Sequence, residues 1–383
     1  MDKPTVQDIF HRFYPAYLDQ YSPSPVQAKV AHNIMNCKTG AYGANVCVCE
    51  DCGFVQIHYN SFRNRCCPMC QAVPKEMWMD ARREDVLDAP YFHLVFTVPD
   101  ILNPVIYSNQ RLLYDALYHA ASSTISELTA DPKHLGAKVG YICILHTWGS
   151  EMNFHPHIHT ILLGGGLASN NQWKDNGENF FLPIRVISKV FRGKYLEELK
   201  RLWKEDKLVF HGTAEKFRNH YTFKELLDSC YGMDWIPHCK KTFNGAQTVI
   251  KYLGKYTHRI AVSNHRIVRM DDDTVTFLVK DYRNEGQWKE LTISGVEFVR
   301  RFLMHVPPRR FVRIRHYGLL CSRTKSQKLT FCRNLLGCKK YLSKLRDMEM
   351  PEILEHLYGI KVCVCKACGG HLGKPQMRMP LRC

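Results

Sequence analysis

The sequence lacks any apolar run of the roughly 18 residues that a membrane-spanning helix needs. Its first residues, Met1 to Thr5, also lack the basic-then-apolar pattern of a secretory signal. We therefore expect a cytosolic protein with no membrane partner. At 383 residues the chain is long enough for two or three domains, and nothing in it indicates how many copies assemble.

Acidic residues are scarce relative to basic ones, with 36 Asp and Glu against 53 Lys and Arg, and the formal net charge is +17. A basic excess of this size favours a polyanionic partner, because Lys and Arg that neutralise phosphates release counterions. The 311–315 segment alternates arginine with apolar residues, as a strand with one basic face would. Arg313 and Arg315 are therefore candidate DNA contacts, and a solvated basic face is the alternative.

Because no secretory signal is present, the 17 cysteines are not expected to form a disulfide framework. The pattern C-x2-C-x14-C-x2-C is formed by Cys49, Cys52, Cys67 and Cys70. Two C-x-x-C turns supply four thiolates for a closed, structural Zn²⁺ site, which predicts a small zinc ribbon. A second cysteine-rich knuckle could hold another zinc, alone or with Cys383, or remain as free thiols; it contains Cys363, Cys365, Cys368 and His371.

Histidines alternate at the start of the 154–166 stretch, which continues as an apolar run and ends in glycines. On a strand, alternate side chains point to one face, so His157 and His159 would present two imidazoles side by side. Two neutral imidazoles on a rigid strand make a good platform for a metal ion. Taken alone, the pattern fits a polar strand face or two hydrogen-bonded histidines equally well.

The order of elements predicts an α+β fold. Strands are expected over 91–98, 138–148 and 154–166, with a helix over 104–128 between the first two. This order implies an antiparallel or mixed sheet covered by a helix. Further helices are expected over 71–90, 186–204 and 294–304, and an edge strand over 235–243. The expected regions are helices in 1–36, a zinc-binding ribbon in 37–89, a central domain in 90–265 with an insertion around 167–234, and a basic accessory region with the cysteine-rich knuckle in 266–383.

A helix over 245–259 would place Tyr252 and Tyr256 on one face, four residues apart. Basic residues surround them as candidate DNA contacts, namely Lys251, Lys255, His258 and Arg259. An isolated tyrosine pair is more often ordinary packing. Beside a metal platform and a basic excess, it instead fits attack on a DNA phosphodiester, which needs a nucleophile, a Lewis acid and a held strand. Two tyrosines would allow two successive covalent links.

Together these motifs resemble the two-tyrosine HUH transposases of bacterial rolling-circle insertion sequences, the insertion sequence 91 family. The resemblance is carried by six stretches in the family's order, namely 59–71, 92–99, 145–149, 155–159, 252–259 and 315–320. It implies a zinc-binding module followed by an HUH-type nuclease domain, whose central antiparallel sheet is flanked by helices.

The resemblance also implies roles for single residues. Tyr252 and Tyr256 match the catalytic tyrosines, which form 5′-phosphotyrosine links with single-stranded DNA, and His157 and His159 match the ligands of Mg²⁺ or Mn²⁺. HUH enzymes usually add a third ligand, for which His146 is the candidate and His155 the runner-up. The zinc ligands of the family match Cys49, Cys52, Cys67 and Cys70. Members often carry histidine at the positions of Asn45 and Cys66, which leaves the ligand set of the ribbon open.

The sequence as a whole predicts a transposase that acts on single-stranded DNA at transposon ends and on target DNA, in the cytoplasm at the nucleoid. It would drive rolling-circle-type transposition by cleaving and rejoining strands. A plasmid replication initiator or relaxase with the same chemistry is one alternative. A zinc-ribbon DNA-binding protein with an inactive nuclease fold is an alternative of a different class.

Overall fold

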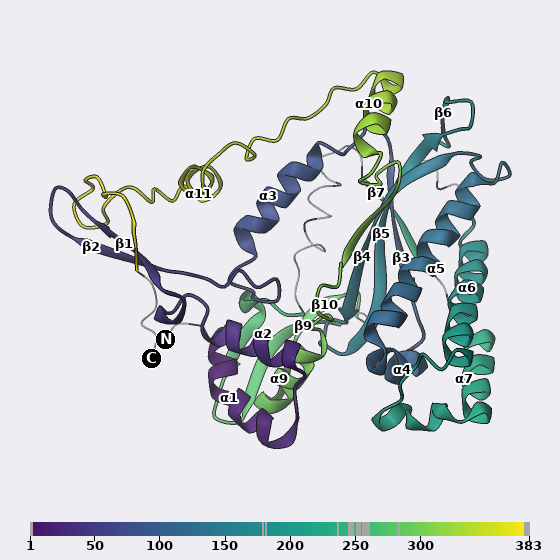
Figure 1. Ribbon diagram of the computed structural model, residues 1–383, viewed down its shortest axis with the longest axis horizontal. Helices are drawn as coiled ribbons and strands as arrows, with labels where there is room; N and C mark the ends of the chain where they lie inside the picture. The colour runs from purple at the N-terminus through teal and green to yellow at the C-terminus, as the bar shows by residue number, and fades with distance from the viewer. Residues whose placement is uncertain are drawn as a thin grey trace.

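The computed structural model describes residues 3–177, 180, 182–235, 237–243, 249, 254, 261–281 and 284–378 (Figure 1). Within these residues a six-stranded antiparallel sheet carries helices on its faces, and two smaller three-stranded sheets lie beyond it. The expected α+β fold, with a small ribbon preceding the central sheet, is confirmed. None of the described helices has both the length and the apolar character needed to cross a bilayer.

The central sheet has the strand order β11–β4–β5–β3–β7, and β6 pairs with β5. The strands are β3 (Tyr91–Thr97), β4 (Lys138–Trp148), β5 (Phe154–Leu167), β6 (Trp173–Asp175), β7 (His238–Phe243) and β11 (Ile314–Gly318). The three strands expected around the histidines are thus present. The expected edge strand is also present as β7, which begins after Pro237, a residue with no N–H for a strand ladder.

One face of the central sheet is covered by helices (Figure 1), namely α4 (Asn103–Ser108), α5 (Gln110–Ala130), α6 (Ile184–Lys204) and α7 (His220–Gly232). Alternate strand residues such as Phe92, Leu94 and Leu145 are buried in this helix-covered core. The helix expected over 104–128 is divided at Asn109, whose side-chain amide donates to the carbonyls of Val105 and Val209. The helices α6 and α7 lie within 167–234, the range predicted to be an insertion.

The opposite face of the sheet contacts α3 (Ala72–Arg83) and α10 (Lys325–Leu336). Apolar strand residues such as Ile144, Ile161 and Leu163 are buried there against Met79 and Leu329. The helix α3 ends earlier than the expected 71–90 range. Farther along the same face, histidines replace these apolar residues, and the candidate site lies there.

A second core joins the N-terminal helices to a later part of the chain. It contains α1 (Val6–Gln20), α2 (Pro25–Met35), α9 (Gly295–Met304) and the sheet of β8 (Ile267–Met270), β9 (Thr274–Asp281) and β10 (Gln287–Ser294). Phe10 of α1 meets Phe302 of α9 edge to face, with ring centroids 5.2 Å apart. This contact ties α1 to a helix almost three hundred residues later in the chain.

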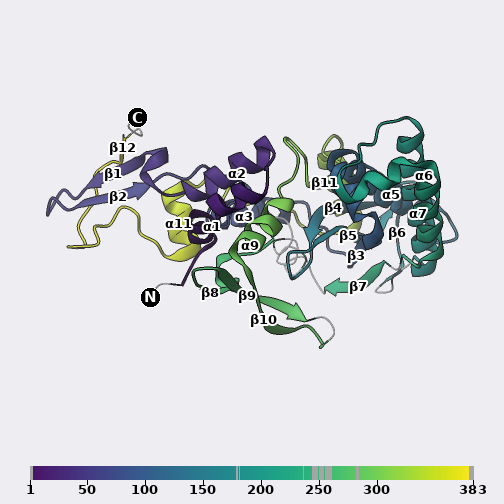
Figure 2. The ribbon, with the colours of Figure 1, turned by 90° about the horizontal axis from the view of Figure 1, so that it is seen from below.

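The ribbon lies at the opposite end of the molecule from α6 and α7 (Figure 2). Its strands are β1 (Ala44–Val48), β2 (Val55–Tyr59) and β12 (Gln376–Arg378), and α11 (Met350–Tyr358) lies between the central sheet and the ribbon. The expected accessory region 266–383 therefore contributes strands to all three sheets, through β8 to β10, β11 and β12.

Candidate functional site

Three histidines gather on the sheet face opposite α5. His157 and His159 occupy alternate positions of β5, and His146 of β4 is the register partner of His157. Strand pairing brings these side chains together, because directly opposed residues of an antiparallel pair share a face. Their ligand nitrogens all lie within 4.8 Å of one another. The structure thus brings the predicted pair together with the predicted third ligand, whereas His155 lies outside the group and contacts Asp100 at 3.2 Å.

The hydrogen bonding of His157 fits a metal ligand. Its Nδ1 lies 2.7 Å from the carbonyl oxygen of His155 and therefore carries the proton that it donates. Its Nε2 faces Nε2 of His159 at 3.1 Å. Adjacent ligands of an octahedral ion with bonds of about 2.1 Å are about 3 Å apart, so this spacing suits a shared divalent ion. Burial lowers the pKa of His157 to about 4, which leaves the imidazole neutral and able to ligate near pH 7.

A fourth histidine, His93 of β3, lies behind this group. Its Nε2 is 2.9 Å from Nδ1 of His159, the two rings are stacked, and its side chain is buried. A second-layer partner of this kind fixes which ring nitrogen of a ligand faces the metal. His93 is not among the residues predicted from the sequence. The available signal was its position in an alternating strand that pairs with the strand carrying His157 and His159.

The histidines line a pocket of about 730 Å³. Its other walls carry cationic and aromatic side chains, among them Lys75 of α3, Arg266, Lys280 of β9 and Trp288 of β10. Trp288 is half exposed, and Nζ of Lys280 and Cζ of Arg266 lie 5.4 Å and 5.8 Å from its ring centroid. Such walls suit a single nucleic-acid strand, because cations meet its phosphates and an aromatic ring stacks on a base.

The two candidate tyrosines, Tyr252 and Tyr256, lie outside the described residues. So do the four candidate DNA contacts nearby, Lys251, Lys255, His258 and Arg259. Gly254, which stands between the tyrosines in the sequence, is described and lines the histidine pocket. A Cβ atom at this glycine would lie 2.0 Å from Sδ of Met79, so the chain passes close against α3 here.

The two arginines predicted to contact DNA have other surroundings. Arg315 pairs in register with Cys143, whose side chain points into the helix-covered core. Arg315 therefore faces away from the histidines, forms an ion pair with Asp115, and lies 4.0 Å above the ring of Tyr118. Arg313 lines a small cavity beside Cys66 and Trp148. Neither arginine lines the histidine pocket, and their contact with DNA stays a prediction.

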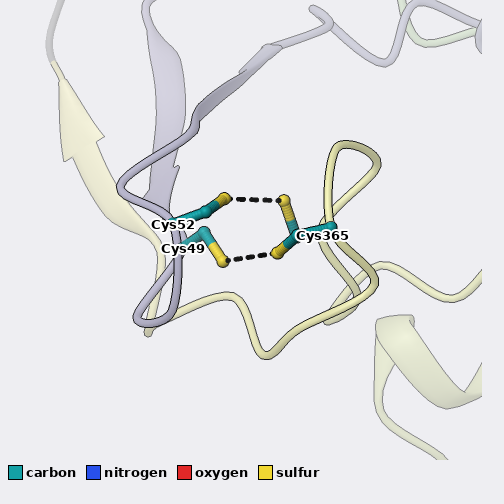
Figure 3. Close-up of side chains that lie close together, drawn as sticks. Cys49, Cys52 and Cys365 are labelled. Atoms are coloured by element: carbon teal, nitrogen blue, oxygen red, sulfur yellow. Dashed lines mark hydrogen bonds between the residues drawn. The ribbon is translucent and has the colours of Figure 1, made fainter.

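The cysteines group differently from the expected C-x2-C-x14-C-x2-C site. Cys49 and Cys52 lie with Cys365 and Cys368, whereas Cys67 and Cys70 lie with Cys37 (Figure 3 shows part of the first group). The reason is the β1–β2 hairpin: Cys49 and Cys52 are at its tip, and β2 carries the chain back over five residues, about 17 Å, before Cys67. The expected four-thiol set is therefore corrected to two separate groups, and the knuckle at 363–371 supplies ligands to one of them.

The second group is buried in the second core. Sγ of Cys37 lies 3.2 Å from Sγ of Cys70, and Cys67 completes the three thiols. The hydrogen bond from Cys67 lowers the pKa of Cys70, which favours the thiolate form of this sulfur. Cys66 lies outside the group, and the amide of Asn45 donates to Asn60 in the ribbon. Thiolates at this spacing suit a soft ion such as zinc.

Comparison with protein families gives two matches. Residues 9–98 match the family described as "Transposase zinc-binding domain", and residues 140–328 match the family described as "Putative transposase". The first match includes both the ribbon hairpin and the cysteines of the second group. The second match includes the strands that carry His146, His157 and His159.

Two curated relatives have similar sequences along most of the chain. The "Putative transposase y4qJ" of Sinorhizobium fredii (strain NBRC 101917 / NGR234) is 40% identical over 369 residues, which are 95% of this chain and 93% of the relative. The transposase for insertion sequence element IS801 of Pseudomonas savastanoi pv. phaseolicola is 30% identical over 309 residues, which are 79% of this chain and 72% of the relative.

Among solved structures, conjugative relaxase TrwC in complex with oriT DNA is similar over part of the chain. Its copper-bound structure is 12% identical and aligns with 67% of this chain and 99% of that chain, at a TM-score of 0.26. Its metal-bound structure is 18% identical and aligns with 29% of this chain and 43% of that chain, at a TM-score of 0.22. Both TM-scores are low.

Proposed function

This chain belongs to the insertion sequence 91 family of transposases, and on that premise we propose that it cleaves and rejoins single-stranded DNA through phosphotyrosine links. The substrates would be the ends of an insertion sequence and a target strand, which the protein would meet at the nucleoid in the cytoplasm. The family predicted from the sequence motifs is confirmed, and the chemistry is the proposal.

The observation that carries this proposal is the cluster of His146, His157 and His159 at the base of the basic, aromatic pocket. Gly254 lines the same pocket and lies two residues from both Tyr252 and Tyr256. Because two residues of chain span at most about 7 Å, this supports a role for the tyrosines close to the histidines. A sequence motif and a three-dimensional cluster thus favour one reaction centre of the HUH type.

The proposed reaction exchanges one phosphoester for another. A tyrosine oxygen loses its proton and attacks the phosphorus, the bond from phosphorus to the 3′ oxygen breaks, and that oxygen takes up a proton as a 3′-hydroxyl. The 5′ phosphate remains esterified to the tyrosine, so a later 3′-hydroxyl can reverse the exchange without ATP. A Mg²⁺ or Mn²⁺ ion held by the three imidazoles would supply Lewis acidity to the phosphate.

The walls of the pocket would hold the strand. Lys75 and Lys280 line it from two segments of the chain, and their charges suit the phosphates. Arg266 is buried, donates to the carbonyls of Ser150 and Leu278, and lies against the ring of Trp288, so it supports the wall of the pocket. The stacking of a base on Trp288 would orient the strand across the histidines. Tyrosine has an unperturbed pKa near 10, so a positioned cationic environment would favour the anion that attacks.

Covalent adduct formation tests the proposal. Full-length protein with Mn²⁺ and a 5′-labelled or 3′-labelled oligonucleotide carrying the element end should form a denaturant-resistant complex that retains only the label on the 3′ side of the cut. Replacing both tyrosines, Tyr252→Phe with Tyr256→Phe, should abolish the adduct while leaving oligonucleotide binding within about twofold. Tyr231→Phe, at an exposed tyrosine of α7, is the matched control and should form the adduct normally.

Two results would contradict the proposal. One is an adduct that persists in the doubly substituted protein, and the other is specific binding with no cleavage at any concentration of Mn²⁺ or Mg²⁺. The second result would favour a zinc-ribbon DNA-binding protein with an inactive nuclease fold. Cleavage at a plasmid origin in preference to an element end would favour a replication initiator or relaxase.

A further inference from the structure

Two five-residue stretches of the chain share the pattern C-x-x-C-G, namely Cys49–Gly53 and Cys365–Gly369. The turns have matching geometry. In each, the final glycine donates its N–H to the carbonyl of the first cysteine, at 3.1 Å for Gly53 and 3.0 Å for Gly369. Each of these glycines has a positive φ, +70° and +78°, which glycine adopts without strain. The third C-x-x-C pair, Cys67 and Cys70, is followed by Gln71 and leads into α3.

The structure places the two matching turns face to face (Figure 3). Sγ of Cys49 lies 3.6 Å from Sγ of Cys368, and Sγ of Cys52 lies 3.8 Å from Sγ of Cys365. All four sulfurs lie within 4.8 Å of one another. Tetrahedral zinc with bonds of about 2.3 Å separates its sulfur ligands by about 3.8 Å, so the observed spacing fits four thiolates around one ion.

Backbone groups around the second turn complete this environment. The N–H of Ala367 donates to Sγ of Cys365, and the N–H of Gly370 donates to Sγ of Cys368, each at 3.4 Å. Amide donors of this kind stabilise thiolates over thiols. Soft thiolates favour Zn²⁺ over hard ions such as Mg²⁺ or Mn²⁺, so this group would not compete for the ion of the histidine cluster.

We propose that Cys49, Cys52, Cys365 and Cys368 bind one zinc ion, which fastens the C-terminal arm (residues 337–378) to the tip of the ribbon. The ion is separate from any zinc held by Cys37, Cys67 and Cys70. The zinc-binding match to residues 9–98 contains only half of the ligands, and the arm supplies the others.

Strand pairing beside the ion points to the same connection. The strand β12 pairs with β1 through Ala44, Asn45 and Val46. Closer to the tip, Glu50 donates its N–H to the carbonyl of His371 at 3.1 Å, and Gly373 donates to Val48 at 2.9 Å. Only three residues of β12 pair with β1, so a bound ion would add substantially to the attachment of the arm.

The other end of the arm is held against α3. Buried Asp80 accepts hydrogen bonds from Tyr341 at 2.7 Å and from Ser343 at 2.6 Å, and Arg346 forms an ion pair with Glu84 at 2.6 Å. The chain enters the ribbon from α2 and leaves it toward α3, and the arm adds a third connection (Figure 1). A further connection that is anchored at both ends restrains how the ribbon can rotate. The zinc ion thus fixes where the ribbon lies relative to the histidine pocket.

Zinc content of the purified full-length protein tests the ligand set. The double variant Cys365→Ser with Cys368→Ser should lose one zinc equivalent per chain. The double variant Cys49→Ser with Cys52→Ser should lose the same zinc ion. The variant with all four substitutions should therefore contain as much zinc as either double variant. The control, Cys321→Ser with Cys338→Ser, replaces two partly exposed cysteines outside the groups and should retain all zinc. Full zinc content in the Cys365 and Cys368 variant would overturn the proposal.

A second measurement keeps all native cysteines, so it remains informative if the variants fold poorly. A protease recognition sequence is inserted after Gly359, between α11 and Cys363, and the purified protein is then cut. The C-terminal fragment should stay bound through gel filtration and should separate when a chelator removes the zinc. A fragment that leaves before chelation, or stays after complete zinc removal, contradicts the proposed fastening. Neither readout depends on DNA cleavage. A negative result here would therefore not contradict the proposed function, and loss of the proposed function would not contradict the zinc site.

Discussion

At the scale of single residues, His93 determines how His159 presents its ring. When Nε2 of His93 accepts from Nδ1 of His159, Nε2 of His159 faces His157 and the proposed metal position. Replacing His93 by phenylalanine removes the acceptor but fills the buried space. We expect Mn²⁺ affinity to fall about 10- to 100-fold, the range for loss of a second-layer partner, with cleavage restored by excess Mn²⁺.

The matched control for this prediction is His93→Gln, whose amide oxygen can still accept from His159. Calorimetric Mn²⁺ titrations of both variants should show a smaller loss for glutamine than for phenylalanine. Equal Mn²⁺ affinity in the phenylalanine variant and the unaltered protein would show that His93 serves packing alone.

Trp288 should contribute to binding of the DNA strand rather than to the chemical step. Stacking of one base on an aromatic ring is worth about 1–3 kcal/mol, so Trp288→Ala should weaken single-stranded oligonucleotide binding about 5- to 150-fold. Trp288→Phe should retain much of the affinity. Tyr221→Ala, which removes a ring that is 76% exposed on α7 and outside the pocket, should bind as the unaltered protein does. Fluorescence anisotropy at fixed salt measures the Kd of each variant. An unchanged Kd for Trp288→Ala would show that the tryptophan does not contribute to strand binding.

At the scale of secondary-structure elements, the junction between α3 and the C-terminal arm depends on Asp80. Burial raises the pKa of this carboxyl, but hydrogen bonds from Ser343, Leu345 and Tyr341 outweigh it and the net pKa is lowered. A carboxylate with a lowered folded-state pKa stabilises the fold above its unfolded pKa, near 3.9. That stabilisation is lost as the pH falls through the lower folded-state value.

Asp80→Asn should therefore reduce the free energy of unfolding by about 2 kcal/mol at pH 7, because charged acceptors make the stronger hydrogen bonds. The difference from the unaltered protein should begin to shrink as the pH falls below about 4, where Asp80 becomes protonated in the unfolded state, and should vanish only below the lowered folded-state pKa. Urea unfolding at pH 7 and at several pH values below about 4 measures how the difference declines. Asp88→Asn, at an exposed carboxylate after α3, is the control and should change stability at none of these pH values.

The strands around the site were predictable because their signals are local. Alternation of side chains in β5 placed His157 and His159 on one face, and the strand order brought His146 beside them. The division of the helix at Asn109 was not predictable, since it depends on a hydrogen bond to Val209, a hundred residues away. Arg315 illustrates the same limit: the alternation of its segment was visible, but only the register with β4 decides which face it occupies.

At the scale of the whole molecule, the cysteine pairing was the main error of sequence reasoning. Spacing alone favoured Cys67 and Cys70 as partners of Cys49 and Cys52, because they follow within the same short segment. The glycine after each matching turn was the available signal for the correct partners. The strand pairing that brings the two turns together joins distant segments of the chain, so it depends on the complete fold.

The separation of the matched cysteines has a consequence for synthesis of the chain. Cys52 and Cys365 are 313 residues apart, so at about 5–20 residues per second the second pair follows the first after roughly 15 to 60 seconds. During that interval the tip of the ribbon has only two of its four thiolates and cannot close a tetrahedral site. A ribosome-bound chain that ends before Cys365 would therefore have an incomplete ribbon tip, whatever the state of its histidine pocket. Only a chain that has been translated past Cys368 can therefore hold the ion with all four thiolates.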